Sequence, residues 1–177
     1  PANNVLALTS TNPAYPTRWI DCVRGGVDSK FIVWGSGQVA SDQSFSSPAD
    51  YAEYFYSDDS TLKSGELVCI ALGENNKVKR CGKGDVLIGV VSTKPGIVGI
   101  YAEDITDAAE EYEKNPHYVK VGLLGQIPIK VSVSNGIIKQ GDQLTIKDNG
   151  VAVKGPSPKT LLILALEAAK EDRTIRA

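Results

Sequence analysis

The stretch that decides the fold class is LVCIALGENNKVKRCGKGDVLIGVVS, residues 67–92. Two runs rich in apolar and β-branched residues, 67–72 and 77–81, flank a polar segment that is typical of a hairpin turn. Residues 85–92 follow with a continuous apolar run, which is typical of a strand in the middle of a sheet. The pattern therefore predicts paired strands over most of this stretch.

The same signals continue toward the C-terminus. Residues 127–133 alternate between apolar and other residues, as expected for a strand with one buried face. Asn135-Gly136 predicts a two-residue hairpin turn, and Asp148-Asn149-Gly150 predicts another. Residues 160–166 fit a helix or a strand; the surrounding pattern favours a strand, with a turn or short helix up to 173. We therefore expect a mainly β fold whose antiparallel hairpins form a barrel- or sandwich-like core.

One segment favours a helix instead. Residues 104–114 are mostly good helix formers, and Asp104 or Thr106 could cap the first turn. Asn115-Pro116 would end the helix. Its acidic residues do not have the spacing of a calcium-binding loop, so we expect a solvated helix face.

A short motif recurs three times, each time just before a predicted strand. Gly65-Glu66, Gly84-Asp85 and Gly141-Asp142 all place an acidic residue directly after glycine. Glycine readily adopts a positive φ, and the acidic side chain can cap the turn. We interpret the motif as turn chemistry rather than as a ligand site.

The N-terminal part differs from the rest. Residues 1–45 hold short apolar runs broken by Gly25-Gly26 and Gly35-Ser36-Gly37, which predicts hairpins. Because an isolated hairpin is marginally stable in water, we expect this β arm to be an assembly segment that packs on the rest of the chain or on a neighbouring chain. Residues 46–60 are predicted to be an aromatic connector, and residues 61–177 a β core domain.

Aromatic residues mark the predicted interface. Tyr51, Tyr54, Phe55 and Tyr56 lie within six residues, and an exposed band of this kind would form an interface. Ordinary core packing is the alternative. Trp19 and Trp34 of the N-terminal arm could join the interface, or could stack on sugar in a glycan-binding tip; burial is the alternative for both.

Composition excludes several functions. The net charge is −2 and the basic residues are scattered, so nucleic acid is not an expected partner. No apolar run approaches the length that crosses a bilayer, so membrane insertion is not expected. No phosphate-binding or dinucleotide motif occurs, and no C-x-x-C pair, so we expect neither a cofactor nor a metal. His117 is the single histidine, and we expect a structural role for it.

Two further features leave alternatives open. Cys69 and Cys81 flank the predicted turn, and their sulfurs could bond; two buried thiols are the alternative. A disulfide would indicate an oxidising compartment. The chain begins at Pro1, after removal of an initiator Met or after cleavage of a precursor.

Asp50-Tyr51-Ala52-Glu53 is the candidate catalytic motif. Carboxylates three residues apart lie on the same side of a helical turn. Close carboxylates push their pKa values apart, so one can hold a proton while the other acts as a base. Such a pair could cut a peptide bond; two solvated acidic residues are the alternative.

Residues 47–55, SPADYAEYF, resemble the ADYAEYFE signature of the C-terminal autoproteolytic, intramolecular-chaperone domain of phage neck appendage and tail-spike proteins. The similarity continues in the same order through residues 87–96, 125–131, 141–145 and 165–167. Related domains end fibre-like bacterial surface proteins. The resemblance implies a mainly β domain that promotes trimer formation and, in some members, cuts itself beside the motif aspartate. Asp50 and Glu53 would then be the catalytic pair, and Ala49–Asp50 the bond that is cut.

These observations lead to one expected function and two alternatives. We expect a structural or assembly domain that homo-oligomerises, as a trimer or higher polymer, in a virion appendage or in an extracellular filament or surface fibre. We expect it not to cleave itself in this form. The alternatives are a self-cleaving trimerisation chaperone, active for a single turnover, and a tip that binds a surface glycan.

Overall fold

The computed structural model describes residues 18–24, 26, 28–41, 50–100, 105–156 and 163–177, with the backbone alone over 105–109. The chain divides into two compact units, Pro1–Ser46 and Ser47–Ala177. Each unit is described by itself. No helix in the described residues is long and apolar enough to span a membrane.

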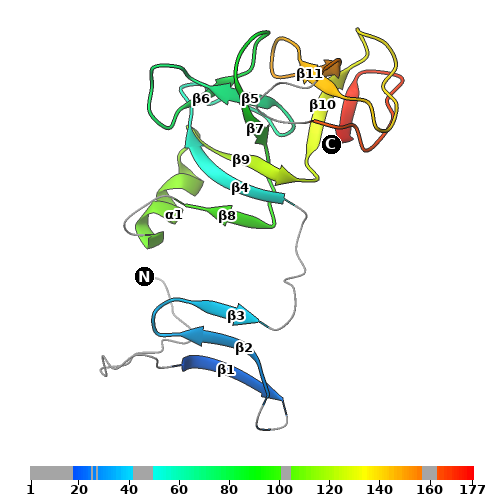
Figure 1. The fold of residues 1–177 in the computed structure, drawn as a ribbon. Coiled ribbons are helices and arrows are strands. Elements are labelled where there is room, and N and C mark those ends of the chain that lie inside the picture. The colour runs from blue at the N-terminus through cyan, green and yellow to red at the C-terminus, as the bar shows by residue number, and fades with distance from the viewer. Residues whose placement is uncertain (1–17, 25, 27, 42–49, 101–104, 157–162) are drawn as a thin grey trace. The chain divides into compact units, whose positions relative to one another are not determined.

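Unit 1 contains a three-stranded antiparallel sheet (Figure 1), in the order β1-β2-β3. Gly26, with a φ of 79°, lies in the first turn. In the second turn the Gly37 amide donates to the Trp34 carbonyl at 2.9 Å. Both hairpins predicted in the N-terminal arm are therefore present. The strands are β1 (Arg18–Arg24), β2 (Asp28–Trp34) and β3 (Val39–Ser41).

Unit 2 contains a six-stranded sheet in the order β6-β5-β7-β9-β4-β8. The predicted hairpin of residues 67–81 is confirmed as the antiparallel pair β5–β6. The predicted central strand is confirmed as β7, which lies between β5 and β9. The strands are β4 (Asp50–Tyr56), β5 (Leu67–Ile70), β6 (Val78–Arg80), β7 (Leu87–Val91), β8 (Ile97–Gly99) and β9 (Tyr118–Gly125).

This sheet is mixed rather than built from hairpins alone. After Lys94-Pro95-Gly96 the chain does not return along β7. It reaches the outer side of β4 instead, where the Gly96 amide donates to the Asp50 carbonyl at 2.9 Å. Strand β8 then pairs with β4 in parallel.

A second sheet of unit 2 has the order β11-β12-β10-β13. The hairpin predicted at Asp148-Asn149-Gly150 is confirmed as the antiparallel pair β11–β12. Strand β12 also pairs with β10 in parallel, and β13 pairs with β10 on its other side. The strands are β10 (Pro128–Ser132), β11 (Leu144–Ile146), β12 (Ala152–Lys154) and β13 (Arg173–Arg176).

Two C-terminal expectations are corrected. Asn135-Gly136 does form a turn, in which the Gly136 amide donates to the Val133 carbonyl at 2.8 Å. The chain beyond it does not pair with β10, however, because β12 and β13 occupy both edges of that strand. The expected strand at 160–166 is described from Ile163 onward, and there only Leu164 forms a bridge, to Gln143.

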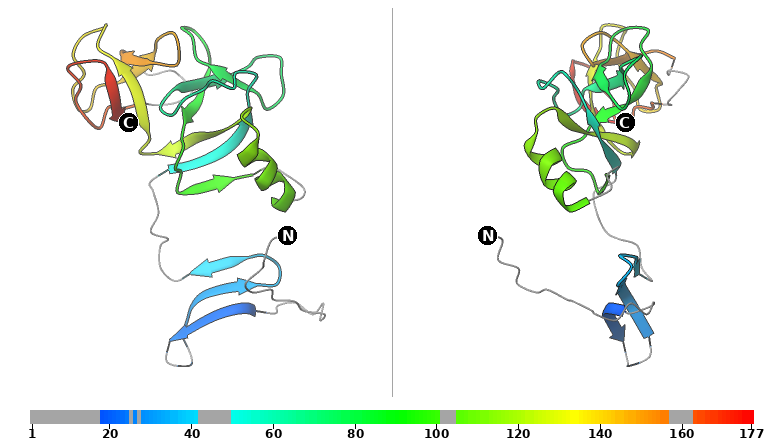
Figure 2. Two further views of the ribbon diagram at one scale, coloured as in Figure 1. Left: turned by 180° about the vertical axis from the view of Figure 1, so that it is seen from behind. Right: turned by 90° about the vertical axis from the view of Figure 1, so that its left-hand side faces the viewer.

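Helix α1 (Ile105–Lys114) lies within the predicted helical segment and ends before Asn115-Pro116. Both views in Figure 2 show it beside the six-stranded sheet, where it contacts β9. Lys114 pairs with Glu110 one turn earlier. Of the two expected caps, Asp104 lies outside the described residues, as does the side chain of Thr106.

The main core lies between the two sheets of unit 2. Its buried side chains come from β5 and β7 of one sheet and from β10, β11 and β13 of the other. Cys69 and Cys81 form a disulfide inside this core, with 5.0 Å between their Cα atoms. The mainly β fold is thus confirmed in its sandwich-like form, without a closed barrel in the described part of the chain.

The three glycine–acid motifs form the same turn. Gly65, Gly84 and Gly141 all have φ between 80° and 89°, which is the left-handed region that favours glycine. In each turn the acidic side chain accepts a hydrogen bond from the backbone amide three residues earlier. The pairs are Glu66 with Lys63 at 3.0 Å, Asp85 with Gly82 at 2.8 Å, and Asp142 with Lys139 at 2.7 Å.

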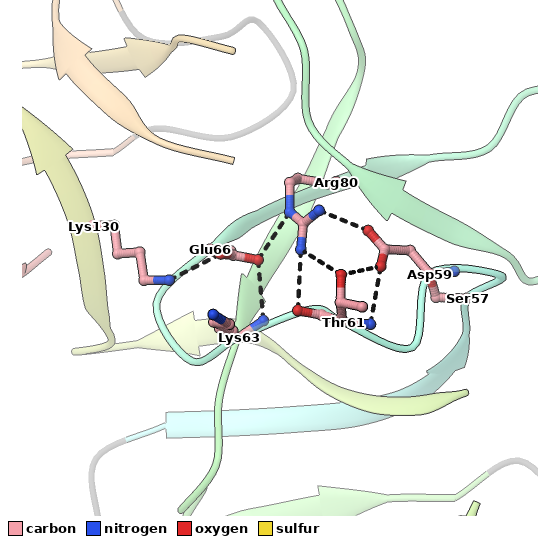
Figure 3. Close-up of polar contacts among 7 residues, drawn as sticks. All are labelled: Ser57, Asp59, Thr61, Lys63, Glu66, Arg80 and Lys130. Atoms are coloured by element: carbon pink, nitrogen blue, oxygen red, sulfur yellow. Dashed lines mark hydrogen bonds and ion pairs between the residues drawn. The ribbon is translucent and has the colours of Figure 1, made fainter. Parts of the chain in front are cut away.

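Glu66 also joins the two sheets (Figure 3). Its carboxylate binds Nζ of Lys130 from β10 at 2.9 Å and Nε of Arg80 from β6 at 3.0 Å. Arg80 continues the network to Asp59 at 2.8 Å and to the Thr61 carbonyl at 3.1 Å. Burial alone would raise the pKa of Glu66, but Lys130, the Lys63 amide and Arg80 together hold it below the usual 4.5.

We expect Glu66→Gln to lower the free energy of unfolding by about 2 kcal/mol at pH 7, because hydrogen bonds between charged groups are lost in a buried position. Because the pKa of Glu66 is lower in the folded state, its contribution is complete above pH 4.5 and is lost as the pH falls through the folded value. Urea unfolding of both proteins from pH 7 to pH 3 measures this difference.

Glu110→Gln is the matched control, because Glu110 forms an exposed pair within α1. We expect it to change the stability by less than about 0.5 kcal/mol. Equal stability of Glu66→Gln and the wild type at pH 7 would contradict the role of Glu66.

Candidate functional site

Strand β4 carries the Asp50–Glu53 motif. Asp50 is its first residue and pairs with Gly125 of β9, and its carbonyl accepts the Gly96 amide that precedes β8. Backbone hydrogen bonds therefore hold the motif from both sides. Ala49, on the other side of the predicted cleavage bond, lies outside the described residues.

The two carboxylates of the motif lie on opposite faces of β4. Asp50 and Ala52 are buried, whereas Tyr51 and Glu53 are partly exposed. This alternation is that of a strand, in which successive side chains point to opposite faces. The expectation that Asp50 and Glu53 lie on the same side of a helical turn was therefore wrong. Within one chain, β4 does not bring them together as an acid–base pair.

The Asp50 carboxyl group is buried. The residue is 8% exposed, and its Oδ2 atom has no hydrogen-bond partner in the described residues. A Cβ atom at Gly122 of β9 would lie 3.4 Å from Oδ2 and 2.5 Å from Cδ1 of Ile127. Gly122 thus leaves room for the Ile127 side chain beside the Asp50 carboxyl group.

Glu53 is held by its neighbour on the other face of β4. The Tyr51 hydroxyl donates a hydrogen bond to Oε1 of Glu53 at 2.6 Å, and this bond raises the pKa of Tyr51. Both side chains cross Gly99 of β8, where a Cβ atom would lie 2.5 Å from the Tyr51 oxygen and 3.0 Å from Cγ of Glu53. The absence of a side chain at Gly99 lets this pair lie flat on the sheet.

The other aromatic residues of β4 have partners within unit 2. Tyr54 contacts Tyr112 of α1, with 5.3 Å between ring centroids, and Tyr56 contacts Tyr118 of β9 at 5.5 Å. Phe55 packs against the smaller core cluster. All three rings stay partly exposed, so their role in an interface between chains stays a prediction.

The sheet of unit 1 has no buried side chain among its described residues. Ile20, Val33 and Val39 pair across its three strands and therefore share one face. Ile20 is 40% exposed and Val39 is 48% exposed. Trp19 is 42% exposed and Trp34 is half-buried. The described residues of this unit thus present an apolar face and form no buried core among themselves.

His117 has structural partners. His117 Nδ1 lies 2.7 Å from the Ser57 carbonyl, and its ring stacks on Tyr56. Across the described part of the chain, no group of three or more His, Cys, Asp or Glu residues could hold a metal ion.

Sequence reasoning missed the two glycines beside the motif. Gly99 and Gly122 lie inside strands β8 and β9. A glycine within an apolar run is a signal for close approach of another group. That signal was present in the sequence, but the partners of each glycine come from other strands.

Comparison with known proteins identifies the family. The model of the Peptidase_G2 family, described as the IMC autoproteolytic cleavage domain, matches residues 6–107, which is more than half of the chain. The chain belongs to the Peptidase_G2 family. The resemblance seen in the sequence is confirmed.

Named relatives of this Peptidase_G2 chain come from Bacillus phage phi29. The pre-neck appendage protein of that phage is 27% identical over 154 residues, which cover 63% of this chain and 18% of the relative. The crystal structure of its pre-mature gene product 12 is similar with a TM-score of 0.57, at 19% identity, over 77% of this chain and 24% of that chain. The gene product 12 C-terminal fragment matches with a TM-score of 0.54, at 21% identity, over 72% of this chain and 98% of the fragment. This chain thus spans less than a fifth of the appendage protein.

We expect Gly122→Ala to lower the free energy of unfolding by about 1–3 kcal/mol, because the new methyl group would overlap Ile127. Gly82→Ala is the control, because a Cβ atom there would have ordinary contacts starting at 3.5 Å. Thermal and urea unfolding of both variants measure the effect. Equal stability of the two variants would contradict the close approach at Gly122.

Proposed function

We propose that this chain is an assembly domain of a virion appendage and that it associates with further copies of itself. The family match and the pre-neck appendage relative support a role in a phage structure. The observation that carries self-association is the sheet of unit 1, in which no described side chain is buried. The described side chains of this three-stranded sheet are all exposed or half-buried, and an exposed apolar patch of this kind marks an interaction site.

A second copy of the same sheet is the cover that the geometry favours. Ile20, Val33 and Val39 form a row across the sheet, and a repeated row of this kind suits a symmetric contact between identical chains. Both a trimer and a higher polymer are compatible with such contacts between copies of the chain. Unit 2, by contrast, already encloses a core between its two sheets.

We expect the full chain to elute as an oligomer in size-exclusion chromatography with light scattering. Ile20→Lys and Val39→Lys should each raise the dissociation constant at least about tenfold, because each places a charge on the apolar face. Ala40→Lys is the matched control, because Ala40 lies on the opposite face of β3. A wild-type monomer at high concentration would refute the proposal.

A second candidate function is self-cleavage at the Ala49–Asp50 bond. Two observations favour it: the buried Asp50 carboxyl oxygen without a described partner, and the family's description as an autoproteolytic cleavage domain. In the reaction, water would add across the amide bond to leave a carboxylate on Ala49 and an amine on Asp50.

The opposite faces of β4 limit how this reaction could occur. Asp50 and Glu53 do not meet within one strand, so a single copy does not provide a close carboxylate pair. We propose that an isolated copy stays intact and that any cleavage takes place in the assembled state, where a second copy can supply a carboxylate.

Intact-mass spectrometry of the assembled wild type should reveal a fragment that begins at Asp50. Asp50→Asn and Glu53→Gln should each lower the cleavage rate at least about a hundredfold, as expected for loss of an acid or base group. Tyr51→Phe should lower the cleavage rate by a smaller factor, because it keeps the ring and removes only the hydrogen bond to Glu53. An oligomer that stays intact over days would refute self-cleavage but not assembly.

A further inference from the structure

Unit 2 contains an open cleft of about 890 Å³ beside helix α1. Its lining residues come from the second half of β4, from α1, from the start of β9 and from the turn before β6. We call it the tyrosine cleft. It is lined by Glu53, Tyr54, Phe55, Tyr56, Asn75, Asn76, Lys77, Tyr112 and Tyr118.

Four tyrosine rings form a continuous aromatic surface in the cleft. Tyr112 stacks on Tyr118 with 4.1 Å between ring centroids. Tyr54 contacts Tyr112, and Tyr56 contacts Tyr118 edge-on. The rings are held in place from behind, because His117 stacks on Tyr56 and is itself bound to the Ser57 carbonyl. All four rings remain partly exposed, so the surface is both rigid and accessible.

The lysines of the cleft and its border are already paired, whereas Glu53 adds a lining carboxylate that accepts a hydrogen bond from Tyr51. Lys77 pairs with Asp58 and Glu74, and Lys120 pairs with Glu113. No lysine of the cleft is therefore left to bind a phosphate or another anion. The Lys77 and Lys120 ammonium groups lie 5.4 Å and 5.6 Å from the centres of the Tyr56 and Tyr54 rings, so a ligand has to use the remaining exposed parts of the aromatic surface.

The rim of the cleft provides neutral hydrogen-bonding groups. Asn75 and Asn76 are exposed, and their carboxamides have no hydrogen-bond partner among the described residues. Each carboxamide can both donate and accept. Asn76 has a φ of 53°, a turn conformation that asparagine tolerates.

These features together select the class of ligand. Aromatic rings suit a ligand with an apolar side, the carboxamides and the Glu53 carboxylate suit a ligand with many hydroxyl groups, and the paired lysines disfavour an anion. A pyranose ring combines all three, because its axial C–H groups form an apolar face and its hydroxyls point outward. We propose that the tyrosine cleft binds a pyranose residue of a neutral glycan. The site is separate from Trp19 and Trp34 of unit 1 and does not depend on the proposed assembly or cleavage.

The probes for the test are four neutral disaccharides: maltose, cellobiose, lactose and chitobiose. Each is titrated to about 10 mM into the full chain, with heteronuclear NMR shifts as the readout. We expect at least one to shift the signals of the cleft residues and to saturate. The shifts should lie near Tyr56, Tyr118 and the Asn75–Asn76 turn.

Two variants change the cleft without removing side chains that stabilise the fold. Asn75→Ala and Asn76→Gly remove one carboxamide each on an exposed turn, and glycine tolerates the backbone of residue 76. We expect each to weaken binding about tenfold. Trp19→Ala is the matched control and should leave binding unchanged. The proposal fails if no disaccharide binds, if the Asn variants bind as the wild type does, if Trp19→Ala removes binding, or if a sulfated disaccharide binds more tightly than its neutral counterpart.

Discussion

The backbone hydrogen bonds on both sides of β4 determine the direction of every side chain in the Asp50–Glu53 motif. Strand β9 pairs with β4 along its whole length, and β8 pairs with its first half. A strand held in this way must alternate its side chains, so the two carboxylates point to opposite faces. Asp50 is directed toward the core and Glu53 toward Tyr51. The chemistry of the motif therefore depends on what else reaches each face, and not on contact between the two acids.

The two units differ in what they bury. Unit 2 encloses apolar side chains between two sheets, with a disulfide inside and the Glu66 network joining the sheets. Unit 1 has three strands and no buried side chain among its described residues. The enclosed core of unit 2 and the exposed apolar face among the described residues of unit 1 support the self-association proposed above.

Short polar turns stabilise unit 2 through their side chains as well as through their backbone. The same glycine–acid turn occurs before β5, before β7 and before β11, and in each the acid both closes the turn and binds a basic side chain. Glu66 is the most buried of the three and contacts both sheets. Turn chemistry and sheet packing are therefore linked through one side chain.

Local patterns in the sequence were enough to predict much of this molecule. The β5–β6 hairpin, the interior position of β7, the helix before Asn115-Pro116 and the glycine–acid turns follow from apolar runs and turn residues close together in the chain. The motif and the family were also recognisable, because residues 47–55 and the later blocks keep their order.

Contacts between distant segments were decided only by the tertiary structure. The parallel pairs β4–β8 and β10–β12 join strands that the local sequence does not predict to be neighbours. A hairpin signal such as Asn135-Gly136 does not produce a hairpin when both edges of the preceding strand are already paired. The same holds for the site. That Asp50–Glu53 is a strand rather than a helical turn, and that Gly99 and Gly122 make room beside it, depends on backbone pairing with β8 and β9. Sequence spacing determines which side chains are available, whereas pairing across the sheet determines which of them meet.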